Sequence, residues 1–202
     1  MSNFFDEMAK VKIIDNHEKL IEITNKEIIY KHSYKNNGFS GALDKVYARE
    51  SVVQKLDNIS KLLKEDGLTL GIFDAYRPLV LQKFLGEQFS DAVSEGFISP
   101  VNNLEHFVPP HMTGGAVDLA IFKDGQMLNF GTEFDDFTEK ANTMYFDGLN
   151  EKIHNNRMKL VNIMAEYGFT NYSAEWWHFD YGDQFWGAIK ETHAIYGNID
   201  IK

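Results

Sequence analysis

The sequence of 202 residues contains no cysteine. This absence excludes disulfides, thiolate nucleophiles and cysteine-based zinc or iron–sulfur sites. Long hydrophobic runs are also missing, because no window approaches the roughly 20 apolar residues that a membrane-spanning helix needs. Residues 1–7 lack the basic region and apolar stretch of a secretory signal. We therefore expect a protein of the cytoplasm, where disulfides are rare.

Basic residues are few compared with acidic ones. The chain has 20 Lys and Arg against 30 Asp and Glu, which gives a formal net charge of −10. Such a surface repels nucleic-acid phosphates and anionic lipid headgroups. We expect neither a nucleic-acid nor a membrane partner; the oligomeric state is left open.

Several common catalytic motifs do not occur. The sequence has no P-loop, no Gly-x-Gly-x-x-Gly, no Gly-x-Ser-x-Gly and no His-Glu-x-x-His. The absence of these motifs argues against the common nucleotide-binding proteins, serine hydrolases and helical zinc proteases. Any catalytic site must be built from other residues.

The hydrophobic pattern predicts one α+β domain over residues 1–202, with a mainly antiparallel sheet flanked by helices. Hydrophobic residues make up 44% of the chain, enough for a substantial core. Apolar spacing predicts helices over 51–64, 79–93 and 151–167, with Gly67 and Gly168 as stops, and one or two short helices near the end. Strands are expected within 11–31, 68–73, 116–122 and 176–181, and loops over 33–41, 97–116 and most of 123–149.

The segment around His111 and Asp118 combines a loop histidine, a glycine pair and a strand aspartate. Glycines at 114 and 115 permit the tight return that lets the two side chains converge. Asp118 lies in an apolar strand, where an ionised carboxylate is costly to bury unless it is paired or bound to a metal. The pattern predicts a metal ligand at each end of this turn.

A second segment carries Glu175 and His178 among aromatic residues. If its strand neighbours the Asp118 strand, both side chains face one cleft. Two histidines, one carboxylate and a water make an open tetrahedral zinc site, in which the pKa of the water falls to about 7. Glu175 can take the proton of that water. Simple strand alternation puts Glu175 and His178 on opposite faces, so Glu175 must come from the lead-in to the strand or from a bulge.

Arg77 stands before Pro78, which favours an extended backbone at residue 77. Its permanently charged guanidinium can stabilise an oxyanion in a cleft. An Arg-Pro pair at a helix start is also typical of a salt-bridged cap, with Asp74 as the partner. The pattern alone leaves both readings open.

Taken together, these segments resemble the zinc D-alanyl-D-alanine dipeptidases of the vancomycin-resistance (VanX) type. The likeness runs from about residue 30 to residue 181. That family's motifs are Ser-x-His-x-x-Gly-x-Ala-x-Asp and Glu-x-Trp-His, with Asp-Gly-Tyr-Arg-Pro, Gly-x-x-Phe-Asp and Asn-Phe-x-Gly segments elsewhere. The matching residues are His111, Gly114, Ala116 and Asp118, then Glu175, Trp177 and His178, with 74–78, 131–135 and 37–41 similar to the other segments.

The resemblance implies the fold shared by these enzymes, D-Ala-D-Ala carboxypeptidases and Hedgehog signalling domains. It implies one Zn²⁺ per chain, a small D-amino-acid dipeptide as substrate, and Asp135 as the group that holds the substrate's amino end. Pro109 replaces the family's serine, so a hydroxyl that can bind substrate is lost and the exact dipeptide is open. The implied zinc ligands are His111, Asp118 and His178, with Glu175 as general base and Arg77 as transition-state stabiliser.

Three functions are compatible with the motifs. The first is hydrolysis of a D-Ala-D-Ala-type dipeptide, which the missing signal and the Asp135 match favour. The second is a D,D- or L,D-carboxypeptidase that trims peptidoglycan peptides of the cell wall. The third is a non-catalytic zinc-binding module, against which Glu175 and Arg77 argue, because a structural zinc site needs neither.

Overall fold

The main sheet of the computed structural model, which describes residues 2–145 and 151–201, has the strand order β2-β4-β5-β8-β7. Only β2 and β4 run parallel; the other neighbours are antiparallel, and β6 pairs with β5. The predicted α+β fold with a mainly antiparallel sheet is confirmed. The strands are β2 (Ile29–Tyr30), β4 (Thr69–Asp74), β5 (Val117–Lys123), β6 (Gln126–Met127), β7 (Thr170–Asn171) and β8 (His178–Asp180). A separate pair joins β1 (Leu20–Glu22) to β3 (Tyr47–Arg49).

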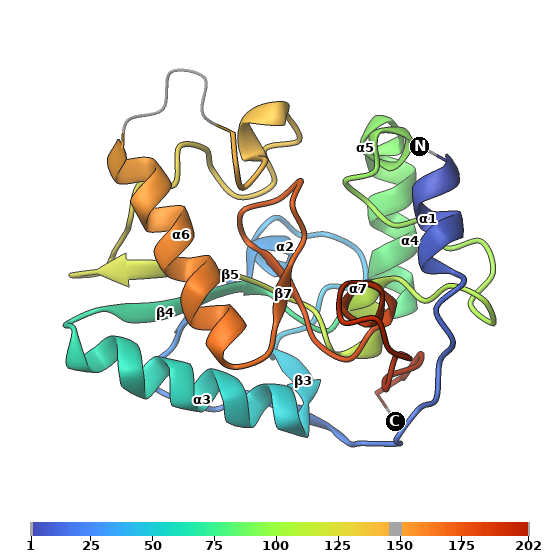
Figure 1. The fold of residues 1–202 in the computed structure, drawn as a ribbon, viewed down its shortest axis with the longest axis horizontal. Coiled ribbons are helices and arrows are strands. Elements are labelled where there is room, and N and C mark those ends of the chain that lie inside the picture. The colour runs from blue at the N-terminus through green and yellow to red at the C-terminus, as the bar shows by residue number, and fades with distance from the viewer. Residues whose placement is uncertain (1, 146–150, 202) are drawn as a thin grey trace.

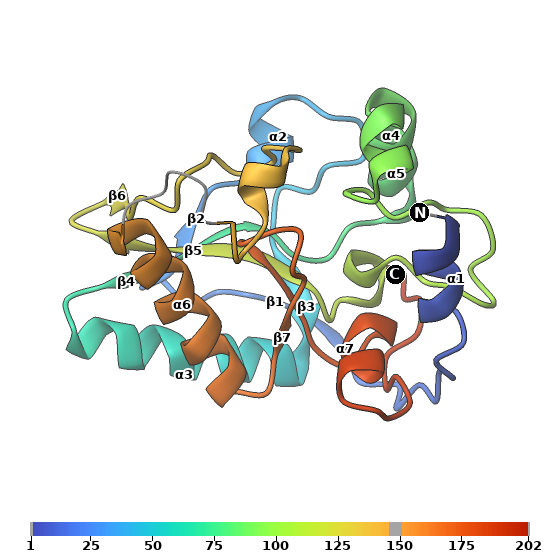
Figure 2. The same cartoon turned by 45° about the horizontal axis from the view of Figure 1, so that its top comes forward.

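Two long helices pack against the sheet, α3 (Glu50–Glu65) and α6 (Glu151–Glu166), as Figures 1 and 2 show. The apolar stripe of α3 and the buried side of α6 share one hydrophobic cluster with β4 and β5. Both helices match their predicted ranges, and each is followed by a glycine with positive φ, Gly67 and Gly168. The glycine stops are confirmed, since left-handed backbone suits glycine.

A second cluster lies beside the first and includes residues of α2 (Ser33–Asn36), α4 (Leu79–Gln88) and α5 (Ser90–Glu95). The single helix predicted over 79–93 is wrong. Phe89 has φ −122° and ψ 54°, which interrupts the helix, and its ring contacts Phe39 and Phe137. These contacts come from segments about 50 residues away in either direction, so local periodicity could not reveal the break.

Several other elements differ from the predictions in extent or were not predicted. The loop predicted over 33–41 begins with the four-residue helix α2. The strand predicted over 176–181 is shortened to β8, and Trp176 and Trp177 lie in the turn before it. Helix α1 (Ser2–Met8) was not anticipated, and α7 (Gln184–Ile189) is one of the short terminal helices expected. Single-turn 3-10 helices span Pro110–Thr113 and Glu139–Ala141. The loop predicted for residues 146–149 lies outside the described residues.

Two buried arginines brace the loops that carry site residues. Arg49 donates to the carbonyls of Thr113 (2.6 Å) and Gly197 (2.9 Å), and thereby fixes the turn that holds His111. Arg157 of α6 donates to three carbonyls of the loop after β6, which contains Asp135. Buried hydrogen bonds from charged donors are among the stronger ones in proteins. Each of these two loops is therefore tied to the domain by a buried cation.

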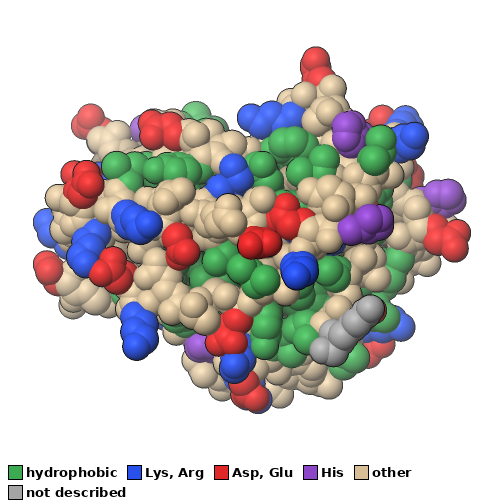
Figure 3. All heavy atoms as spheres, turned by 90° about the horizontal axis from the view of Figure 1, so that it is seen from below, with side chains coloured by type: hydrophobic (Ala, Val, Ile, Leu, Met, Phe, Trp, Pro, Cys, Tyr) green, Lys and Arg blue, Asp and Glu red, His purple; other side chains and the backbone are tan. Residues whose placement is uncertain are grey.

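The surface is mixed in charge. On the face shown in Figure 3, acidic and basic side chains are interspersed with small groups of hydrophobic ones. Within the described part of the chain, no helix combines the length and apolar character needed to cross a bilayer. The predicted lack of a nucleic-acid partner stays a prediction.

Candidate active site

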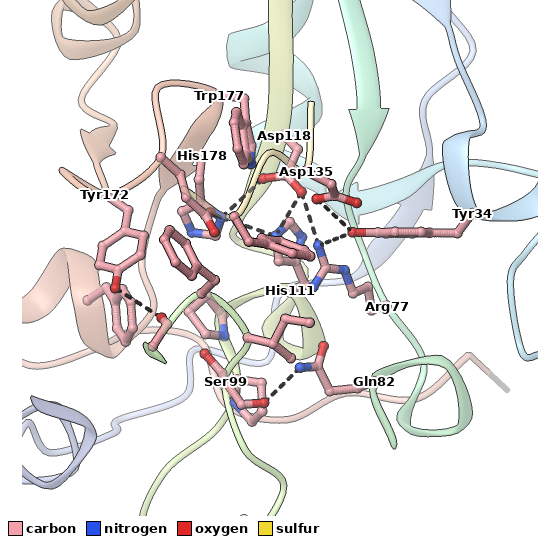
Figure 4. Close-up of a pocket in the computed structure, with 18 residues that line it drawn as sticks. Tyr34, Arg77, Gln82, Ser99, His111, Asp118, Asp135, Tyr172, Trp177 and His178 are labelled. Atoms are coloured by element: carbon pink, nitrogen blue, oxygen red, sulfur yellow. Dashed lines mark hydrogen bonds and ion pairs between the residues drawn. The ribbon is translucent and has the colours of Figure 1, made fainter. Parts of the chain in front are cut away.

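Asp118 and His178 are brought together by the register of two strands. They are direct partners in the antiparallel β5–β8 pair. Side chains of residues directly opposite each other lie on the same face of a sheet. The Nδ1 atom of His178 is accordingly 3.1 Å from an oxygen of Asp118. The two strands are therefore neighbours, which was the condition for a shared cleft, and Figure 4 shows the two side chains close together.

His111 reaches the same place from the 3-10 turn before β5. Gly114 closes that turn with φ +73°, in the left-handed region. Gly115 passes so close to the backbone of Tyr181 that a Cβ atom would lie 2.2 Å from its carbonyl oxygen. Glycine is therefore required at both positions, for conformation at one and for space at the other. The Nε2 atom of His111 ends 3.3 Å from Asp118 and 3.2 Å from His178 Nδ1.

The outer nitrogen of each histidine faces an acceptor. Nδ1 of His111 lies 2.6 Å from the carbonyl oxygen of Ala75, and Nε2 of His178 lies 2.7 Å from a carboxylate oxygen of Asp180. Each ring therefore carries its proton on the outer side, and its inner nitrogen points at the partner ring and at Asp118. Two such nitrogens 3.2 Å apart need a cation or a proton between them.

The three inner atoms fit one zinc ion. One ligand atom from each of His111, Asp118 and His178 lies within 4.8 Å of the others, and all three residues are buried. The two histidine nitrogens are 3.2 Å apart, close to the roughly 3.3 Å expected between tetrahedral ligands of zinc, and they face different oxygens of Asp118 at 3.1 and 3.3 Å. Two imidazoles and a carboxylate leave one tetrahedral position open, which is the pattern of catalytic rather than structural zinc sites.

Glu175 lies in the turn that leads into β8, as strand alternation required. One of its carboxylate oxygens is 3.7 Å from His178 Nδ1, on the side of the three inner atoms. Its side chain is buried, and burial raises its pKa to about 8, with the charges of Asp118 and Asp135 adding to the shift. A carboxyl group with such a pKa can both accept and release a proton near neutral pH.

Arg77 follows β4 and forms the salt bridge with Asp74 that the sequence allowed, while its role toward an oxyanion stays a prediction. Its Nε pairs with Asp74, while Nη2 donates to Asp118 (3.0 Å) and to the hydroxyl of Tyr34 (3.1 Å). Its backbone N–H donates to the carbonyl of His111 at 3.1 Å. The guanidinium is thus fixed at the edge of the ligand cluster by a salt bridge and a backbone link.

Asp135 comes from the loop after β6 and has φ +60°, a conformation rare for residues other than glycine. Its carboxylate accepts a hydrogen bond from Tyr34 at 3.4 Å, and burial raises its pKa to about 7. Tyr34 was not predicted as a site residue. The segment 33–41 offered only a loose family match, and nothing local indicates that its ring lies beside Arg77.

One cavity contains all six predicted site residues (Figure 4). Carboxylates outnumber the single arginine in it, so the cavity favours cations, including a metal ion and an ammonium group. Pro109, which replaces the serine of the family motif, also lines this cavity. Aromatic side chains, Trp177 among them, form part of the remaining wall. The predicted residues are Arg77, His111, Asp118, Asp135, Glu175 and His178.

A buried His–Asp–His cluster with an adjacent proton-carrying carboxyl group defines a candidate metallohydrolase site. The family model Peptidase_M15, described as D-Ala-D-Ala dipeptidase, matches residues 36–197. The chain belongs to this peptidase family. The predicted family and the prediction of an enzyme are confirmed, while the chemical role of each residue stays a prediction.

The relatives agree with this assignment. A D-alanyl-D-alanine dipeptidase of Synechocystis sp. is 30% identical, over 75% of this chain and 78% of the relative. One from Escherichia coli K12 is also 30% identical, over 67% of this chain and 69% of the relative. Among solved structures, the LdcB LD-carboxypeptidase aligns at 18% identity, with a TM-score of 0.47 over 89% of this chain and 77% of that one. That score is too low to bear on function.

Proposed function

We propose that this chain hydrolyses the peptide bond of a D-Ala-D-Ala-type dipeptide with one zinc ion held by His111, Asp118 and His178. The observation that carries the proposal is the arrangement of these three residues beside Glu175 in a cavity that also contains Asp135. Names of the relatives support the choice of dipeptide. We further propose that residues 1–202 form one zinc peptidase domain that acts in the cytoplasm.

When bound, zinc supplies Lewis acidity and lowers the pKa of a water to about 7. The protein's own groups do the remaining work. Glu175 accepts a proton from the attacking water and delivers it to the leaving nitrogen, which its raised pKa permits. Arg77 stabilises negative charge on the carbonyl oxygen, and its links to Asp74 and His111 hold it in position.

Asp135 supplies the specificity for a free amino end. Its carboxylate lies in the same cavity as the ligand cluster, next to Tyr34. A buried ammonium group needs a fixed anion, and a carboxylate with a raised pKa ionises when such a cation arrives. An N-acylated peptide has no ammonium group and gains nothing from Asp135.

A second candidate function is a D,D- or L,D-carboxypeptidase. One observation favours it: Asp135 also lines a second groove, whose lining includes Lys31, Asn36 and Glu133. The groove could accept the rest of a longer peptide. The non-catalytic module is disfavoured, because a structural site has no use for the buried Glu175 carboxyl group.

A substrate panel separates these functions. The zinc-loaded protein is incubated with D-Ala-D-Ala, D-Ala-D-lactate, L-Ala-L-Ala and an N-acylated pentapeptide ending in D-Ala-D-Ala, and D-alanine or other product is quantified. We expect rapid cleavage of D-Ala-D-Ala and little cleavage of the pentapeptide. Preferential cleavage of the pentapeptide would establish the D,D-carboxypeptidase, and inertness toward every peptide would exclude both it and the dipeptidase.

Replacing Arg77 with alanine should lower kcat for D-Ala-D-Ala by roughly 10²–10³-fold, the usual loss for one oxyanion donor. Arg77→Lys serves as the matched variant, because it keeps the charge but not the planar fork that bonds Asp74 and Asp118 together. We expect partial activity at most from it. A rise in KM with unchanged kcat would make Arg77 a binding residue instead.

Replacing Asp135 with asparagine should raise KM for D-Ala-D-Ala by about 30-fold or more, as expected when one member of a buried charge pair is removed. Zinc content should not change. Glu133→Gln is the control, since this exposed acid lies two residues away in the same loop but outside the active cavity. Equal KM values for the Asp135 variant and the wild type would exclude it as the ammonium site.

A further inference from the structure

Asp180 contacts the ligand cluster through the outer nitrogen of His178. It lies two residues after His178 in β8, and residues two apart in a strand share a face. Its side chain is 0% exposed. One oxygen is 2.7 Å from His178 Nε2, the nitrogen that points away from Asp118.

The burial of the Asp180 carboxylate does not by itself stabilise the fold. Within the described residues, no N–H group donates to its second oxygen, and the carboxyl group of the buried Asp183 lies beside it, with a pKa raised by burial and by the charge of Asp180. A buried carboxylate beside a second acid is destabilising unless its remaining partner needs it. The partner here is a residue of the candidate metal site.

The two histidines of the cluster are oriented in different ways. The outer nitrogen of His111 bonds a backbone carbonyl, that of Ala75, at 2.6 Å, which no substitution removes, while the nearest carboxylate oxygen, on Asp74, lies further away at 3.5 Å. The outer nitrogen of His178 faces a side chain. An anionic acceptor fixes the ring proton on Nε2, leaves the Nδ1 lone pair free, and makes the ring a stronger electron donor.

We propose that Asp180 is the positioning residue of the metal site: its charged carboxylate holds His178 with Nδ1 directed at the zinc and strengthens that ligand. This rests on the proposed function, since it assumes zinc between His111, Asp118 and His178. Asp180 touches neither substrate nor reacting atoms and acts only through His178.

The test measures zinc affinity rather than turnover. Metal-free wild type, Asp180→Leu and Asp180→Asn are titrated with zinc against a chelating indicator, and circular dichroism confirms the fold of each. We expect Asp180→Leu, which has a similar size but no acceptor, to bind zinc about 10–100-fold more weakly. Asp180→Asn keeps an acceptor without the charge and should recover most of this loss, ending about three- to tenfold below wild type.

Asp57→Asn is the matched control. Asp57 lies on α3, outside the active cavity, and its carboxylate accepts from the side-chain amide of Asn25 at 2.9 Å. Its zinc affinity should stay within about threefold of wild type. The proposal is overturned if Asp180→Asn binds zinc as tightly as wild type, if Asp180→Leu does so while folded, or if Asp57→Asn loses as much affinity as the Asp180 variants. Failure of the wild type itself to bind zinc would refute the proposed function instead.

Discussion

Glu175→Gln should reduce kcat for D-Ala-D-Ala by about 10²–10⁴-fold while the protein still binds one zinc ion. Glutamine keeps the size and hydrogen-bonding capacity of the side chain but cannot carry the proton from the attacking water to the leaving nitrogen. The buried position of Glu175, with an oxygen 3.7 Å from His178 Nδ1, leaves this task to it. The measurement is the rate of D-alanine release, with zinc content determined on the same sample.

An exposed carboxylate provides the comparison for this variant. Glu166→Gln changes an exposed acid at the end of α6 and should leave both the rate and the zinc content unchanged. Near-normal turnover by Glu175→Gln, with zinc in place, would remove Glu175 as the general base. The proton would then have to be carried by another group of the cavity, and Asp135 would be the first candidate.

His178→Ala should lose both zinc and hydrolysis. The substitution removes one of three protein ligands and leaves the buried carboxylates of Asp118 and Asp180 without their shared imidazole partner. Zinc per chain after dialysis should fall from about one to near zero, and activity with it. His193→Ala replaces an exposed histidine and should retain both properties.

The folded state of this variant must be checked, because unpaired buried carboxylates destabilise a protein by several kcal/mol, on the order of 3–5. A circular dichroism spectrum like that of wild type is therefore part of the measurement. A folded His178→Ala protein that still holds one tightly bound zinc per chain would contradict the proposed ligand set.

Local patterns predicted most of the ligand cluster. Strand alternation orients Asp118 and His178, and the glycine pair returns the chain after His111. The pairing of the two strands joins residues 60 positions apart and stayed a condition that no local pattern could establish. The lead-in position of Glu175 follows from the same alternation. Asp180 could have been found in this way too, since the pattern His-x-Asp on a strand puts both side chains on one face.

Other parts of the site have no local signal. Tyr34 meets Asp135 across 101 residues, and no pattern within either segment indicates the contact. The left-handed backbone of Asp135 is likewise unreadable from sequence, because its loop is held in place by Arg157 of a distant helix. The break at Phe89 has the same origin. Long-range contacts override helix propensity there.

The central claim is that a single zinc ion bound by His111, Asp118 and His178 is required for cleavage of the dipeptide. The most direct measurement is a titration of metal-free protein with zinc while D-alanine release from D-Ala-D-Ala is recorded. We expect no activity without metal, then a linear rise that stops at one zinc per chain. Full activity in the metal-free protein, or a rise that continues well beyond one equivalent, would contradict the account.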